Sequence, residues 1–149
     1  GVDRVVTGAV DASGLIDMGL LSELDAAVGL DRVVFHRAFD EAADHALARQ
    51  QLLDSGIRTV LTSGGKATAT EGVDGIRESV ASGLTVVAGA GVQPDHVSTL
   101  LAAGVEAVHA SCRVPFPGAK GRLFDAGRTC VGPGRVQALV MSVASADRP

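Results

Sequence analysis

The sequence contains no Trp and no Tyr, and only four of its 149 residues are Phe. Without large aromatic rings, the core has to be built from Val, Leu, Ile and Ala, which suits a compact α/β protein. Nucleic-acid bases usually stack on aromatic side chains, so this composition argues against a nucleic-acid partner. A net charge of −4, without a run of Lys or Arg, supports the same conclusion.

Long apolar runs and cysteine-rich patterns are missing as well. No stretch is long and apolar enough for a membrane span, and no signal peptide opens the chain, so we expect no membrane partner. The two cysteines, Cys112 and Cys130, make no disulfide framework, and the default expectation is a reducing cytoplasm. The chain begins with Gly1 and a strand follows at once, which we interpret as a sign that an upstream segment has been removed.

The sequence does contain a repeating unit, in which a short Val-rich run is followed by a loop and an amphipathic helix. The runs are typical of buried parallel strands. They span residues 4–7, 32–36, 58–62, 85–89 and 107–111. The predicted helices span residues 17–28, 43–55, 70–82 and 94–103, and a left-handed glycine is expected to close each of them at Gly29, Gly56, Gly83 and Gly104.

Two α/β architectures are compatible with this repeat. The first is a five-stranded open parallel sheet with helices on both faces. The second is a partial (β/α)8 TIM-type barrel, formed by the last five strand–helix units of eight. Length alone favours the open sheet. In the barrel, residues 1–149 form a single partial domain, with a long Gly- and Pro-rich loop over 113–132 and a terminal helix over 133–146.

Functional residues gather at the carboxyl ends of the strands in either fold. Gly89 and Gly91 follow the fourth strand and precede a helix predicted to start at Pro94. Backbone N–H groups in such a turn can approach an anion, and the positive end of the helix would point the same way. The alternative is a tight turn that requires glycine for its geometry alone.

The second strand runs directly into His36 and Arg37. Strand alternation puts their side chains on opposite faces, although the loop can turn Arg37 over the mouth of the sheet. A guanidinium binds carboxylate or phosphate well, so the pair indicates a site for an anionic ligand. The alternative is an ion pair between Arg37 and Asp40 that holds the loop.

Polar residues also follow the third and fifth strands. Thr62 and Ser63 offer hydroxyl groups, with turn formation and helix capping as the alternative. His109 and Ser111 share a face of the fifth strand, whereas Cys112 points away and is interpreted as a small buried residue. No metal ligand and no catalytic residue are assigned. The predicted ligand-binding residues are His36, Arg37, Asp40, Thr62, Ser63, Gly89, Gly91, His109 and Ser111, and we expect several of them around one cavity.

The same strand ends resemble the consecutive motifs of the CutC family over residues 1–112. The motifs are VTGAVD at 6–11, FHRAFD at 35–40, LTSGG at 61–65, AGAGV at 88–92 and HAS at 109–111. The resemblance implies an eight-stranded barrel and a cytoplasmic, oligomeric protein associated with copper homeostasis. The family's first three strands, with the cysteines on which proposed copper binding rests, lie outside this sequence. Copper is therefore implied by the family name only, and the cofactor stays unassigned.

Three functional interpretations stay open. The chain is a copper-homeostasis protein, as the resemblance implies; or a TIM-barrel enzyme or binding protein for a small phosphorylated or carboxylated ligand; or a truncated, inactive homologue. Five strands cannot close a barrel, so both edge strands would lack partners, and barrel-facing residues such as Val5, Val60 and Val87 would lose contacts. We therefore expect a homo-oligomer, or a piece of a longer polypeptide.

Overall fold

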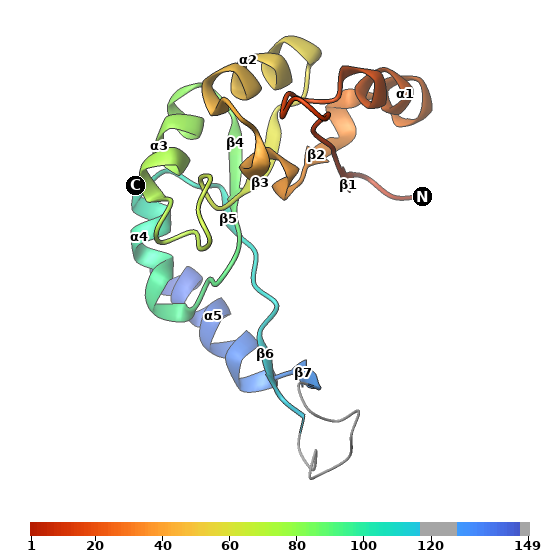
Figure 1. Ribbon diagram of the computed structural model, residues 1–149. Coiled ribbons are helices and arrows are strands. Elements are labelled where there is room, and N and C mark those ends of the chain that lie inside the picture. The colour runs from red at the N-terminus through yellow and green to blue at the C-terminus, as the bar shows by residue number, and fades with distance from the viewer. Residues whose placement is uncertain (117–127, 147–149) are drawn as a thin grey trace.

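A computed structural model shows an α/β fold built on a curved parallel sheet, and it describes residues 1–116 and 128–146 (Figure 1). The sheet contains β1 (Val5–Thr7), β2 (Val33–Phe35), β3 (Thr59–Thr62), β4 (Thr85–Ala88) and β5 (Ala107–Val108). The α-helices between the strands are α1 (Met18–Val28), α2 (His45–Ser55), α3 (Val73–Ala81) and α4 (Val97–Ala102). Short 3-10 helices lie at η1 (Leu30–Arg32), η2 (Arg37–Glu41) and η3 (Pro94–His96).

The order of the strands decides between the two predicted architectures. The five strands lie side by side in sequence order, and every neighbouring pair is parallel. Right-handed connections that always advance in one direction place all their helices on one side of the sheet, as in a barrel. Figure 1 shows α1 to α4 as an outer arc around the strands. The predicted partial barrel is confirmed, and within the described residues the sheet stays open between β1 and β5.

Strand register determines which side chains form the core. Phe35, Val60 and Val86 lie in one row across three strands, and each is at most 1% exposed beneath the helices. The prediction that Val60 faces the barrel interior is therefore wrong. Val5, which was predicted to do the same, pairs with the core residue Val33 and shares its face. Val6 lies on the opposite, concave face and is 59% exposed.

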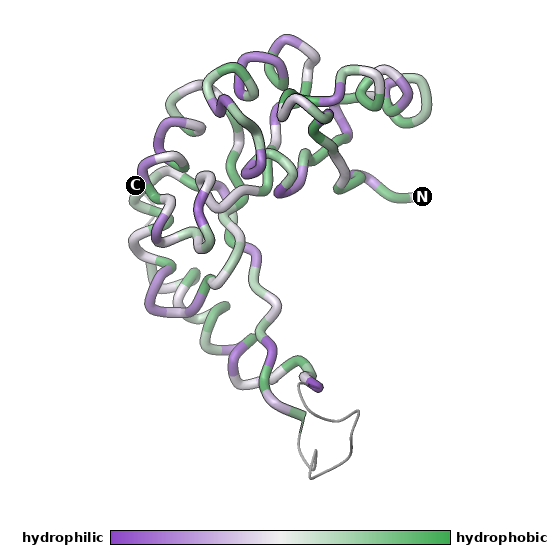
Figure 2. The backbone as a smooth tube through the Cα atoms, viewed as in Figure 1, coloured by the Kyte–Doolittle hydropathy of each residue, from purple (hydrophilic) through white to green (hydrophobic). Residues whose placement is uncertain are grey.

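Local signals explain where the helices begin and end. Asp17 and Asp44 cap α1 and α2, since each carboxylate accepts backbone N–H groups of the first turn. The four glycines predicted to close the helices all have positive φ, between 81° and 97°. In Figure 2 the tube alternates between purple and green along the helices, as expected for helices with one buried face. No helix in the described residues is long and apolar enough to cross a membrane.

The tail differs from the prediction. The described parts of the expected 113–132 loop form an antiparallel hairpin of β6 (Arg113–Pro115) and β7 (Thr129–Val131), while residues 117–127 lie outside the described residues. Such short strands contain too few residues for an alternating pattern to be visible. The terminal helix is confirmed as α5 (Pro133–Ser145), which packs against η3 and α4.

Candidate functional site

The buried carboxylate of Asp40 connects the loops at the strand ends. Its side chain is 3% exposed and accepts hydrogen bonds from η2 and from the loop after β3. The amide of Gly65 donates to Oδ1 at 3.0 Å, and the amide of Ser63 donates to Oδ2 at 3.0 Å. The Thr62 hydroxyl also donates to Oδ1. The carboxylate therefore holds two βα loops together.

These contacts also set the charge of Asp40. Burial raises the pKa of the carboxyl, but the hydrogen bonds from Thr62, Gly65, Ser63 and Arg37 lower it by more, so the net pKa lies below the ordinary value of 3.8. The group is an anion at neutral pH. Thr62 and Ser63, both fully buried, direct their polar atoms toward it. Their role in binding a ligand stays a prediction.

Arg37 lies between this buried anion and the open mouth. Nε donates to Oδ2 of Asp40 at 2.8 Å, and Nη2 donates to Oγ of Ser63 at 3.0 Å. The ion pair considered in the sequence analysis is therefore present. The side chain nevertheless stays 43% exposed, and Nη1 donates to no group in the described residues. The guanidinium is thus held in one orientation with one N–H edge free.

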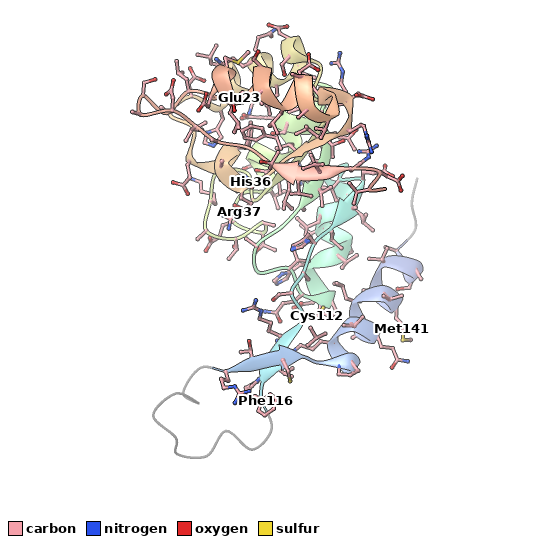
Figure 3. The ribbon with its side chains drawn as sticks, turned by 90° about the vertical axis from the view of Figure 1, so that its right-hand side faces the viewer. Glu23, His36, Arg37, Cys112, Phe116 and Met141 are labelled. Atoms are coloured by element: carbon pink, nitrogen blue, oxygen red, sulfur yellow. The ribbon has the colours of Figure 1, made fainter. Side chains whose placement is uncertain are left out.

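Arg37 lines a cavity of about 270 Å³ at the carboxyl ends of β4 and β5. The opposite walls come from Gly91 on the loop after β4, and from His109 and Ser111 after β5. Four predicted site residues are therefore brought together around one space. Figure 3 looks onto the open side of the sheet, where Arg37 lies near the strand ends and Cys112 lies closer to the hairpin.

Two other predicted residues lie at the same end of the sheet but are not among those lining the cavity. His36 caps η2, where Nδ1 accepts the Ala38 amide at 3.1 Å, so the neutral ring carries its proton on Nε2. Gly89 allows a close approach, because a Cβ there would lie 2.8 Å from the side chain of Leu61. We infer that Gly89 serves packing beside the cavity.

The helix after Gly91 begins at Pro94 as predicted and continues to Ala102, one residue before the predicted end. The chain makes a single 3-10 turn from Pro94 and becomes α-helical only at Val97. The amide of Gln93, the residue before this helix, donates to Nδ1 of His96 at 3.3 Å. A contribution of the helix terminus to anion binding stays a prediction.

The fifth strand also ends early, at Val108, and Cys112 has a φ of 48° in the segment that follows. The geometric reason given for separating His109 from Cys112, namely strand alternation, is therefore wrong. The two residues line different cavities instead. Among the described residues, no three His, Cys, Asp or Glu side chains gather as a metal site would require.

Sequence reasoning missed the part that the tail plays beside this site. A second cavity of about 220 Å³ lies between the segment after β5, the start of η3 and α5. Its lining includes Arg113 and Arg135, from a region that was predicted to be a featureless loop and a terminal helix. The sequence offered no specific signal for this cavity, because arginines occur throughout the chain.

The CutC family model matches residues 1–114, which include every motif of the strand ends. This chain belongs to the CutC family. The CutC family protein of Salmonella agona is 42% identical over 119 residues, covering 78% of this chain and 48% of the relative. That of Salmonella newport is 41% identical over the same length. The chain thus spans about half the length of these CutC relatives.

Solved structures agree on the fold. A CutC structure from Streptococcus agalactiae, described by name as a copper homeostasis protein, matches with a TM-score of 0.65 and 24% identity, over 72% of this chain and 55% of that one. A structure described as native KDPGal matches with a TM-score of 0.57 and 17% identity, over 97% of this chain and 59% of that one. The CutC family match ends at residue 114, so β7 and α5 lie beyond it.

Proposed function

We propose that this CutC chain binds a small phosphorylated or carboxylated molecule in the cavity between Arg37, Gly91 and His109. The observation that carries the proposal is the oriented guanidinium of Arg37, held by Asp40 and Ser63 with one N–H edge open toward the cavity. An arginine that is fixed in this way loses little side-chain entropy when it binds a planar or tetrahedral anion.

The charge of the cavity supports an anionic ligand. The seven residues that line it include Arg37 and no acidic side chain, although the chain as a whole has a net charge of −4. His109 and Ser111 add polar groups on the wall opposite Arg37. Asp40, the nearest buried carboxylate, lies behind Arg37 and is already satisfied by hydrogen bonds.

Calorimetric titration with inorganic phosphate tests this proposal. Arg37→Ala should weaken binding at least tenfold, because a hydrogen bond to a charged group contributes about 1.5–3 kcal/mol. Arg77→Ala is the matched control, since it removes the same charge from an exposed position on α3, where Arg77 pairs with Asp74. We expect this variant to bind phosphate as tightly as the unaltered chain. Equal binding by the Arg37→Ala variant would rule the proposal out.

A role in copper homeostasis is the second candidate, and it is supported by the description of the Streptococcus agalactiae relative. The thiols that this sequence offers to a soft metal ion are Cys112 and Cys130. The hairpin register places Cys130 opposite Val114, while Cys112 lies immediately before β6. A cytoplasmic location is part of this same proposal.

We also propose that the chain self-associates. Strands β1 and β5 are the edges of the sheet in the described residues, and backbone groups at an open edge favour pairing with another strand. Val6 on the concave face of β1 is 59% exposed, so apolar surface accompanies that edge. Sedimentation equilibrium should show a dimer or larger species at micromolar concentration. A compact, stable monomer would contradict this proposal.

A further inference from the structure

Two cavities adjoin along one groove at the strand ends. The cavity at Arg37 and the cavity at Arg135 share three lining residues, Gly91, Val92 and Ser111. The loop after β4 forms one wall of both spaces, and the segment between β5 and β6 forms the other. The groove therefore has an arginine at each end, and a shared middle built from small and apolar side chains.

The end of the groove at Arg135 is held in place by a contact between α5 and β6. Nη1 of Arg135 donates to the backbone carbonyl of Arg113 at 2.7 Å, which fixes the first turn of α5 against β6. The guanidinium of Arg113 has no hydrogen bond and no ion pair within the described residues. Arg135 has no acidic partner there either. Two arginines thus line one cavity, and the nine lining residues in the described part of the chain include no Asp or Glu.

Arg113 and Arg135 are both exposed and can each be solvated, but their shared position at one cavity raises the local positive potential that attracts an anion. The cavity of about 220 Å³ has room for one, since a water molecule occupies only about 30 Å³ of liquid volume. Arg135 lies beyond the family match, which ends at residue 114. The motifs shared with the family therefore do not account for this end of the groove.

We infer that the groove binds a small molecule with two anionic groups at opposite ends, either two phosphates or a phosphate and a carboxylate. This inference rests on the proposed function and extends it from one anion to two. One group contacts Arg37 at the first end. The other contacts Arg113 and Arg135, and the uncharged middle of the ligand lies between Gly91 and Ser111.

The experiment compares a matched pair of probes, fructose 6-phosphate and fructose 1,6-bisphosphate, by calorimetry on the full chain. The bisphosphate should bind at least tenfold more tightly than the monophosphate. Arg135→Ala and Arg113→Ala should each reduce that ratio, and the double variant should bring it close to one. Alanine is a good helix former, so Arg135→Ala is expected to leave α5 intact. Circular dichroism would verify this.

The control variant is Arg77→Ala, which removes the same charge from an exposed site on α3 where Arg77 pairs with Asp74. The ratio should not change in that variant. Equal affinities for the two probes in the unaltered chain would overturn the inference while leaving a single anion site intact. A ratio that survives in the double variant would overturn it as well. Failure of both sugars and of inorganic phosphate to bind would reject the proposed function itself, and the inference with it.

Discussion

The guanidinium of Arg37 contacts the buried carboxylate of Asp40 with an Nε to Oδ2 distance of 2.8 Å, and the two residues are exposed to very different degrees. Asp40 faces the protein and gathers backbone and hydroxyl donors from the loop after β3. Arg37 faces the cavity. The two residues therefore have different roles. Asp40 holds the loops in place, and Arg37 presents a positive charge to a ligand.

Replacing Asp40 with Asn tests the structural role of the carboxylate. The variant keeps the size of the side chain but loses the charge that accepts hydrogen bonds from Thr62, Ser63 and Gly65. We expect the free energy of unfolding to fall by about 1.5–3 kcal/mol, which is the contribution of one hydrogen bond to a charged group. Urea denaturation measures it, and a change below about 0.5 kcal/mol would contradict the structural role.

The lowered pKa of Asp40 predicts how stability changes in acid. Because the folded pKa lies below the ordinary value of 3.8, the carboxylate stabilises the fold fully above that pH, and this stabilisation is lost as the pH falls through the folded pKa. The stability difference between the unaltered chain and Asp40→Asn should therefore shrink below about pH 4. Denaturation midpoints between pH 6 and pH 2 would show whether it does. A difference that stayed constant over this range would argue against the assignment.

Asp11 provides the control for that series. Its pKa is also lowered, first by a hydrogen bond from the Ser13 side chain, but the carboxyl is fully exposed in a local turn. Asp11→Asn should therefore leave the acid dependence that comes from Asp40 in place. Loss of that dependence in both variants would mean that it does not report on the buried site.

The loop after β3 depends on close contacts between glycine backbones. A Cβ on Gly72 would lie 1.8 Å from the carbonyl oxygen of Ser63, a contact that no side-chain motion can relieve. Gly72→Ala should cost about 3 kcal/mol or more of stability, at the upper end of overpacking effects. Gly134→Ala, in α5 with nothing within 4 Å, should be neutral or stabilising by up to about 1 kcal/mol. Thermal unfolding of both variants measures the contrast, and equal effects would refute it.

Much of this arrangement could be predicted from the sequence, because it depends on short-range patterns. Val-rich runs and helix-closing glycines such as Gly56 and Gly104 located the strands and helices, and parallel strands necessarily bring Arg37 and His109 to one end of the sheet. The orientation of Val60 could not be predicted in the same way. The neighbouring residues Val60 and Leu61 are both apolar, so alternation carries no signal about which of them meets the helices.

The tail shows a second limit of sequence reasoning. The hairpin strands have three residues each and are separated by a long segment, so neither periodicity nor a tight-turn motif predicts them. Arg113 and Arg135 are 22 positions apart, and only the packing of α5 brings them together. Long-range contacts of this kind depend on tertiary structure, which is why the second cavity was missed.

Copper binding can be tested separately from anion binding. We predict no tight Cu(I) site in this chain, because Cys112 and His109 line different cavities and Cys130 lies on the other arm of the hairpin. Competition against a chromogenic Cu(I) chelator should leave the metal with the chelator. Stoichiometric transfer to the protein, abolished in Cys112→Ser, would contradict this prediction and support the copper-homeostasis candidate.

Backbone amide spectra recorded during a phosphate titration test the central claim most directly, because they locate the anion as well as detecting it. We predict saturable shifts at Gly91, at Ser111 and at the Nε–H of Arg37, with Thr85 at the opposite end of β4 unaffected. The same titration of Arg37→Ala should remove the shifts at Gly91 and Ser111. Saturable shifts confined to other parts of the chain, or none at all, would contradict the claim that an anion site lies between Arg37 and His109.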